Sequence, residues 1–337
     1  TGMIYGVFGT LNMADIAIKM SELDSPASGT LLTIAVLYFL AFAMKAAAFP
    51  VNFWLPASYH TPNIVVSAVF AGLLTKVGVY ALLRIFVLIM PGSREALADL
   101  FALVAILTLM TGAFGALAQS ELRRLLGYLV IAGIGSMLAG IAVGTTLALS
   151  GAIFYAVHSI IVMTALYMAS GIVNMMSGTY DLRQLGGLYQ RNVAFAAVFL
   201  VLAFAVSGLP PFSGFWPKVL LVDAAFADGR ALLGAAILLS GFLTTIAMGR
   251  VWIYAFWRGG PEGTPDGESL GPGAAAAVAG GGAAGLAGPA VWLPLGILTA
   301  MIVYFGLQPE WILELSTRGA VGLVEPRGYL RSVFGGL

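Results

Sequence analysis

The sequence contains no cysteine and only two histidines, His60 and His158. Without cysteine there is no disulfide, no thiolate nucleophile and no cysteine-held iron–sulfur cluster, and two distant histidines lack the spacing of a metal site. We therefore expect no cofactor and no bound metal. Charge is scarce as well: 9% of the residues are charged and the net charge is +1. This composition does not predict a basic surface for nucleic acid or another anionic partner.

Hydrophobic residues fill the sequence instead. They make up 60% of the chain, and the mean hydropathy is +0.97. Uncharged stretches of about 20 residues or more recur, and because a helix of that length crosses the hydrocarbon core, we expect an all-α polytopic membrane protein. The pattern predicts about nine transmembrane helices, the first one truncated. Their expected ranges are 2–12, 30–49, 63–90, 97–119, 124–143, 148–174, 192–226, 231–257 and 288–307.

Two further segments bear on the organisation of the chain. Residues 258–290 are rich in glycine, alanine and proline, a composition typical of a flexible loop. The chain starts at Thr1, directly before the apolar stretch "GMIYGVFG". This stretch lacks the positively charged region that would precede it in a signal peptide. We interpret the sequence as the rear portion of a longer polypeptide.

Loop charges predict an orientation in the membrane, since lysine and arginine are usually retained in the cytoplasm. One set of alternate loops contains Arg123, Arg124, Arg183, Arg191 and Arg258. The other set contains Lys19, Arg94 and Arg230. The first set is therefore expected on the cytoplasmic side, although arginines in the C-terminal tail fall on the opposite side and weaken this prediction.

Proline interrupts two of the expected helices, each of which also contains a lysine. Pro50 lies in the segment 31–56, and Pro210 and Pro211 lie in the segment 192–226. Proline removes a backbone donor, which membrane helices tolerate only where protein or water satisfies the freed carbonyl. Paired broken helices in two halves of a chain indicate a transport site near the middle of the membrane.

Three lysines fall within apolar stretches: Lys45, Lys76 and Lys218. An ionised lysine at bilayer depth costs roughly 2.5–3.5 kcal/mol even on the gentlest scale, and such residues commonly mark proton or ion pathways. We predict that these three lysines relay protons. The alternative is that they are structural charges bonded to carbonyls or to an acid on another chain.

His158 stands alone among uncharged neighbours in "AIFYAVHSIIVMTALYMASG", and an imidazole exchanges protons near neutral pH. We predict that it joins the relay, the alternative being a histidine that only packs and forms hydrogen bonds. His60, in "SYHTP", is expected at a loop or helix end. It is either a surface residue or a secondary member of the relay. Asp223 follows Lys218 by five residues and is a possible counter-ion, although that spacing is poor for pairing on one helix.

Several stretches resemble the antiporter-like subunits shared by Mrp-type Na⁺/H⁺ antiporters and respiratory complex I. They are "FPVNFWLPASYHTP", "SGLPPFSGFWPK" and "ELRRLLGYLVIAGIGSM", and the resemblance extends over nearly the whole chain. Within that family, "YGVFGTLNMADIA" and "VEPRGYLRSVFG" look most like the D-type subunits of Mrp antiporters.

The resemblance implies a bundle of about fourteen helices in two inverted repeats, each containing a broken helix. The implied parts are 1–90 as the rear of the first repeat, 91–257 as the second repeat, the loop 258–290, and a last helix with a tail at 291–337. On this resemblance, Lys45 and Lys218 match the lysines of the two broken helices, and Lys76 matches the lysine of the helix that follows the first break.

Two departures from the family pattern stand out. The family's glutamate that partners the Lys45-type lysine would lie before Thr1 and is absent from this sequence. Several relatives have a further lysine a few residues after the His158 position, where this chain has Met163. The relay is therefore expected to pass through His158 and water, or to bypass this helix.

Together these features predict a proton-translocating subunit of a multisubunit cation/proton antiporter in a bacterial cell membrane, and not an enzyme. The expected partners are other antiporter subunits, membrane lipid, protons and sodium, with no nucleic acid. One alternative is a proton-pumping subunit of complex I or of a membrane hydrogenase, and another is a structural membrane scaffold with inert buried charges.

Overall fold

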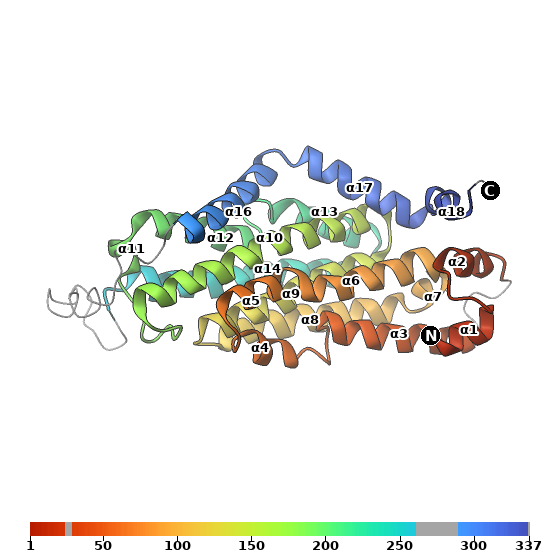
Figure 1. The fold of residues 1–337 in the computed structure, drawn as a ribbon, viewed down its shortest axis with the longest axis horizontal. Coiled ribbons are helices and arrows are strands. Elements are labelled where there is room, and N and C mark those ends of the chain that lie inside the picture. The colour runs from red at the N-terminus through yellow and green to blue at the C-terminus, as the bar shows by residue number, and fades with distance from the viewer. Residues whose placement is uncertain (24–28, 261–288, 336–337) are drawn as a thin grey trace.

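The computed structural model describes residues 1–23, 29–260 and 289–335, and over these residues the protein is a bundle of helices without a β-strand (Figure 1). The expected all-helical class is thus confirmed, whereas most of the expected loop 258–290 lies outside the described residues. In chain order, the helices (α) and π-helical segments (η) are α1 (Gly2–Phe8), α2 (Met13–Ser21), α3 (Gly29–Ala46), α4 (Trp54–Tyr59), α5 (Ile64–Val69), η1 (Phe70–Leu74), α6 (Thr75–Leu83), η2 (Arg84–Ile89), α7 (Pro91–Ala96), α8 (Ala98–Ala118), α9 (Leu122–Val143), α10 (Thr146–Ser177), α11 (Leu188–Arg191), α12 (Val193–Ser207), α13 (Phe215–Ala227), α14 (Ala231–Trp252), η3 (Ile253–Trp257), α16 (Pro289–Leu307), α17 (Glu310–Val324) and α18 (Arg327–Phe334).

Six helices in the described part of the chain are long and apolar enough to cross a membrane. They are α3, the continuous run Ile64–Ile89, α8, α9, α10 and the run Ala231–Trp257. The pair Val291–Leu307 and Glu310–Val324, bent by 82°, gives a seventh if it is counted as one broken span. The predicted total of nine is not confirmed, because α1 has 7 residues and α12 has 15, short of the roughly 20 that a full crossing needs.

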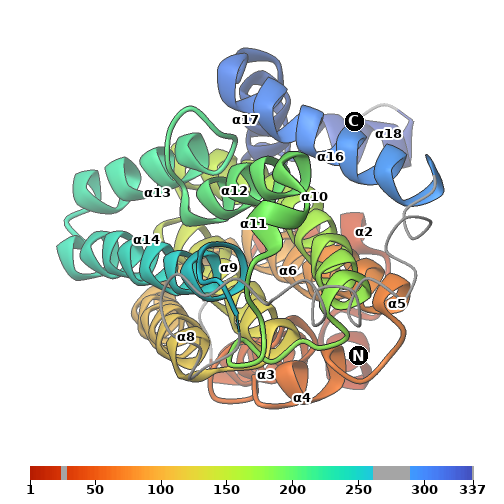
Figure 2. The same cartoon turned by 90° about the vertical axis from the view of Figure 1, so that its left-hand side faces the viewer.

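Helix α9 forms the centre of the bundle, and 94% of an 18-residue stretch of it is buried inside the protein. It packs against α8 on one side and α10 on the other, as the end-on view in Figure 2 shows. Small residues allow this close packing. If Gly112 of α8 carried a Cβ, that atom would lie only 2.4 Å from the backbone nitrogen of Ala132 in α9, so a larger residue would force the two helices apart. Membrane helices associate through such close van der Waals packing, because lipid provides no hydrophobic force between them.

The loop charges collect at the two ends of α9, whose 22 residues span about 33 Å. Arg123 and Arg124 begin the helix, whereas Arg94 donates a hydrogen bond to the Val143 carbonyl at its far end. The two sets of charged loops thus lie on opposite sides of an apolar layer of membrane thickness. Which side faces the cytoplasm stays a prediction.

The first break separates α3 from α4, and Pro50 lies within it. Helix α8 supplies hydroxyl groups to the exposed backbone and side chains there. The Phe49 N–H donates to Thr108 Oγ1 at 3.0 Å, and Asn52 Nδ2 donates to Thr111 Oγ1 at 3.0 Å. Polar groups freed by the interruption are therefore satisfied by the neighbouring helix, as the membrane interior requires.

The second break separates α12 from α13 and contains Pro210 and Pro211. Helix α12 ends at Gly208, whose φ of 84° is a left-handed conformation that glycine adopts without a Cβ penalty. Helix α16 closes the break from outside, since the Trp216 indole donates to the Gly306 carbonyl at 2.8 Å and the Ser213 N–H donates to the Ile302 carbonyl at 3.2 Å.

Candidate functional site

Lys76 is buried in the middle of the span Ile64–Ile89, with 6% of its surface exposed. Its Nζ donates a hydrogen bond to the Ala71 carbonyl at 2.6 Å. No carboxylate of the described residues forms an ion pair with it. A cation held by a carbonyl alone retains its full charge inside the bundle, which is the arrangement that favours function over structure at bilayer depth.

The local backbone explains how Ala71 meets Lys76. Residues Phe70–Leu74 form the π-helical segment η1 immediately before the lysine. Single-turn π segments interrupt the usual hydrogen-bond ladder and occur frequently at functional sites. Beside this segment, Ser67 Oγ and Thr75 Oγ1 are buried without a hydrogen-bond partner, so water is the natural partner for both hydroxyls. No sequence pattern predicted the π segment.

His158 is also buried, with 1% of its surface exposed, at the middle of α10. Its Nδ1 lies 2.8 Å from the Ser213 hydroxyl, which belongs to the second break. Gly214 follows, and a Cβ there would lie 2.9 Å from His158 Nε2, so glycine leaves room for the ring. Ser213 belongs to the same break that Lys218 reaches across, so His158 and Lys218 both contact this interruption.

Lys218 lies in the first turn of α13 and reaches back across the second break. Its Nζ donates to the Ser207 carbonyl at 2.6 Å, at the end of α12. Gly208 leaves space for this side chain, because a Cβ there would lie 2.8 Å from the Nζ. The free carbonyls at the end of a helix attract a cation, so the break provides a binding place for the ammonium group.

A cavity of about 560 Å³ opens beside Lys218 between α13 and α14, and Asp223 lines its wall. Asp223 is exposed and forms no ion pair with Lys218. The spacing of five residues predicted this poor pairing on one helix. Asp223 therefore shares the cavity with the lysine without neutralising it.

Lys45 differs from the other two lysines, because its side chain is exposed at the last turn of α3. The sequence predicted a lysine deep inside the bundle. The residues that follow this lysine, Ala46, Ala47 and Ala48, are fully buried, so the chain turns inward directly after Lys45. The structure therefore does not bring Lys45 together with the Lys76, His158 and Lys218 group.

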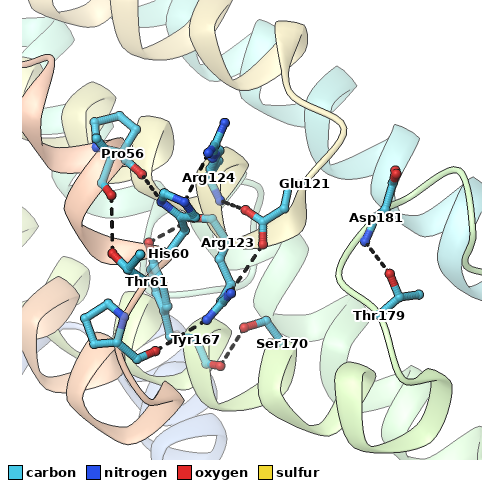
Figure 3. A network of polar contacts seen from close by, with 12 residues as sticks. Pro56, His60, Thr61, Glu121, Arg123, Arg124, Tyr167, Ser170, Thr179 and Asp181 are labelled. Atoms are coloured by element: carbon cyan, nitrogen blue, oxygen red, sulfur yellow. Dashed lines mark hydrogen bonds and ion pairs between the residues drawn. The ribbon is translucent and has the colours of Figure 1, made fainter.

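His60 ends α4 and takes part in the polar network drawn in Figure 3. Its Nδ1 lies 2.9 Å from the Pro56 carbonyl, and its Nε2 lies 3.1 Å from Arg124 Nη2. A carbonyl only accepts and a guanidinium only donates, so Nδ1 faces an acceptor and Nε2 faces a donor. His60 links α4 to α9 in this arrangement and lies apart from Lys76, His158 and Lys218.

Residues from three helices and one break thus form the candidate site: Lys76 on α6, His158 on α10, Ser213 in the break and Lys218 on α13. Sequence analysis predicted the two lysines and the histidine as relay residues, and their roles stay predictions. Ser213 was missed, although its place inside "PPFSGFWP" was a usable signal. Among the residues that the structure describes, no group of three or more His, Cys, Asp or Glu side chains gathers as metal ligands would.

Comparison with known proteins gives consistent results. The family model described as "NADH:quinone oxidoreductase/Mrp antiporter, TM" matches residues 1–244. The chain is 37% identical over 330 residues to the D subunit of the Na(+)/H(+) antiporter of Alkalihalophilus pseudofirmus strain OF4, covering 98% of this chain and 63% of that protein. It is 37% identical over 332 residues to the protein of the same name in Bacillus subtilis strain 168, covering 98% of this chain and 64% of that protein. The chain therefore spans slightly less than two thirds of these relatives.

Solved structures resemble it closely as well. A chain in the structure of the Mrp complex from Dietzia sp. DQ12-45-1b superimposes with a TM-score of 0.86 at 30% identity, covering 99% of this chain and 66% of that one. A chain of respiratory complex I from Thermus thermophilus gives a TM-score of 0.77 at 23% identity, covering 96% and 64%. The second likeness shows a shared fold alone.

Proposed function

The chain belongs to the NADH:quinone oxidoreductase/Mrp antiporter transmembrane family, and from that premise we propose that it is a proton-translocating subunit of a multisubunit cation/proton antiporter. In this proposal, protons move laterally through the bundle by way of Lys76, His158 and Lys218. Water completes the pathway between these groups. Sodium exchange is a property of the assembled complex, in a bacterial cell membrane and with other antiporter subunits as partners.

The chemistry of the three groups supports such a relay. A lysine that is desolvated and held only by carbonyls can release its proton when a nearby positive charge arrives, and regain it when that charge leaves. At 4 Å and an effective dielectric constant near 20, two unit charges interact by about 4 kcal/mol. An interaction of that size is sufficient to move a proton from one group to the next.

Backbone geometry supports the order of the pathway. Lys76 is bonded to η1, and Lys218 is bonded to the end of α12. His158 lies on α10, which packs against both η1 and α13, and is hydrogen-bonded to the second break through Ser213. A neutral imidazole has one donor and one acceptor nitrogen, so it can pass a proton in either direction.

Lys45 lies at the edge of this pathway in our proposal. Its exposed ammonium group is available to a carboxylate on another polypeptide of the complex. The end of α3 packs directly against α6, because a Cβ on Gly78 would lie 2.7 Å from the Ala46 nitrogen. We propose that Lys45 controls proton entry rather than serving as a central carrier.

The observation that carries the proposal is the burial of Lys76 without a carboxylate partner. We expect Lys76→Met to reduce cation-driven proton flux in inverted membrane vesicles to less than about a tenth of wild type, because methionine fills the space but binds no proton. The complex should assemble normally. Lys19→Met is the matched control, since Lys19 is a surface lysine paired with Asp15. Full transport by Lys76→Met at normal subunit levels would exclude the relay, and failure to assemble would favour a scaffold role.

A further inference from the structure

A small cavity of about 190 Å³ lies at the end of the bundle where α8 ends and α9 begins, away from the relay residues. Three arginines line it: Arg183, Arg250 and Arg258, together with Tyr254 and Ala118. Arg250, Tyr254 and Arg258 come from the end of α14, from η3 and from the residue after it, and η3 packs against α11. None of these residues takes part in the proposed proton pathway.

Arg250 projects from the last turn of α14 and holds the end of α8. Its Nη1 donates to the Leu117 carbonyl, and its Nη2 donates to the carbonyls of Gln119 and Ala116. These carbonyls belong to the last turn and the C-cap of α8, where the helix dipole stabilises a cation. The Nε–H of the same guanidinium is buried and has no acceptor.

Arg258, which follows η3, is held in the same way by the loop after Asp181. Its Nη2 donates to the carbonyls of Leu182, Arg183 and Leu185, each at 3.0 Å. Its guanidinium also lies over the Tyr254 ring, 5.0 Å from the ring centroid. The Nε–H of Arg258 is likewise buried without an acceptor.

The two guanidinium groups are therefore fixed in place but not neutralised. Neither Arg250 nor Arg258 forms an ion pair with a carboxylate of the described residues, whereas Arg183 is paired with Asp181 at 3.0 Å. The carbonyl groups around each arginine stabilise its positive charge but do not cancel it. In addition, each buried Nε–H without an acceptor costs free energy. An anion with several oxygen atoms in the cavity would balance the two positive charges, which water alone would not.

The surroundings of the cavity identify the form of that anion. Exposed apolar side chains follow α14 and η3 toward it, namely Phe242, Ile246, Ile253 and Trp257, of which Trp257 is 75% exposed. Exposed tryptophan and tyrosine concentrate at the membrane–water interface, and Tyr189 and Tyr254 lie at this same end of the bundle. Basic pockets between helices at this depth match the headgroups of anionic lipids, while the acyl chains lie along the apolar face.

We propose that this cavity binds a phosphate group, supplied by an anionic membrane lipid whose headgroup contacts Arg250 and Arg258. The inference goes beyond the transport proposal and does not depend on it. Bound lipid would join the end of α8, the loop at 182–185 and the end of α14, three segments that the two arginines already hold. The expected effect is thus on stability.

The test uses the purified complex after lipid removal, with its melting temperature measured in mixed micelles of phosphatidylglycerol, of phosphatidylcholine, and of phosphatidylcholine with inorganic phosphate. We expect phosphatidylglycerol to raise the melting temperature by several degrees over phosphatidylcholine. Ala118→Leu, which fills the cavity and leaves both arginines in place, should abolish this gain without lowering the melting temperature in phosphatidylcholine. Arg191→Gln is the control, because Arg191 also binds a carbonyl, that of Met176, at this end of the bundle but does not line the cavity.

Native mass spectrometry provides the second measurement, with one fewer retained phosphatidylglycerol expected in Ala118→Leu than in wild type. A full gain from inorganic phosphate alone would confirm the anion site but assign it to soluble phosphate. An equal gain from phosphatidylglycerol in wild type and Ala118→Leu, with equal lipid retention, would overturn the proposal and leave the arginines as helix-end caps.

Discussion

The Ser213 hydroxyl lies 2.8 Å from Nδ1 of His158, so a residue in the break between α12 and α13 is hydrogen-bonded to the middle of the continuous helix α10. Both residues are buried. This bond fixes the direction of the imidazole and leaves Nε2 as the free nitrogen of the ring. It thereby connects the second break to the imidazole that is predicted to join the relay.

Ser213→Ala should slow proton transport about tenfold, equivalent to about 1.4 kcal/mol in activation free energy, because the imidazole loses the partner that orients it. Subunit assembly should be unchanged, since the hydroxyl is a small group. Ser213→Thr keeps the hydroxyl and should retain more activity than the alanine variant. The measurement is the initial rate of proton flux in vesicles, and equal rates for the two variants would argue against an orienting role.

His158→Gln separates hydrogen bonding from proton exchange. Glutamine can still bond the Ser213 hydroxyl but cannot take up a proton, so we expect transport to fall roughly a hundredfold while the melting temperature stays within a few degrees of wild type. The measurement is the initial rate of proton flux in vesicles at matched subunit levels. A rate equal to that of wild type would assign His158 to packing.

At Lys218, replacement by glutamate should harm transport less than replacement by leucine. An acid still exchanges protons, although its charged state is reversed, whereas leucine exchanges none. Because Lys218 Nζ donates to the Ser207 carbonyl, the glutamate variant should also lose this bond and transport more slowly than wild type. The assay is dissipation of a pH gradient at matched subunit levels, and identical rates in the two variants would remove Lys218 from the proton carriers.

Gly72→Ala tests the packing of η1 against α10. A Cβ on Gly72 would lie 2.3 Å from Thr164 Oγ1, so the helices must separate or the threonine must move, and we expect a loss of about 1–3 kcal/mol in stability. Gly249→Ala is the control, since that Cβ would meet nothing within 4 Å. Thermal unfolding of the purified complex is the measurement. The double variant Gly72→Ala with Thr164→Ala should recover part of the loss, and no recovery would point to a different cause.

Much of the fold could be predicted from apolar runs between charges. The expected helices 97–119 and 231–257 correspond to Ala98–Ala118 and Ala231–Trp257, because charged or polar residues bound each run and length alone fixes a crossing. The C-terminal helix α17 was not predicted, since its polar residues lower its hydropathy. The 82° bend before it falls at Gln308 and Pro309, where proline ends the preceding helix, and α17 then packs against α10.

The candidate site was predictable only in its ionisable members. Lys76 and His158 stand out because charge is rare inside apolar runs. The exposure of Lys45 could not be predicted, since which face of α3 turns inward depends on neighbours that are distant in sequence. The π-helical turn before Lys76 has no compositional signature either, because a shift from i→i+4 to i→i+5 bonding is decided by tertiary packing.

The close approach of Gly78 to Ala46 limits how the two lysines next to them can influence each other. With no side chain between the two backbones, there is no layer that could be compressed or expanded, so α3 and α6 cannot slide apart or together at this point without losing direct contact. This contact favours a fixed arrangement of α3 and α6 near Lys45 and Lys76. In the proposed relay, a change in the interaction between the two ammonium groups would therefore come from side-chain torsions, from protonation or from the arrival of water, and these are fast local events rather than movements of whole helices.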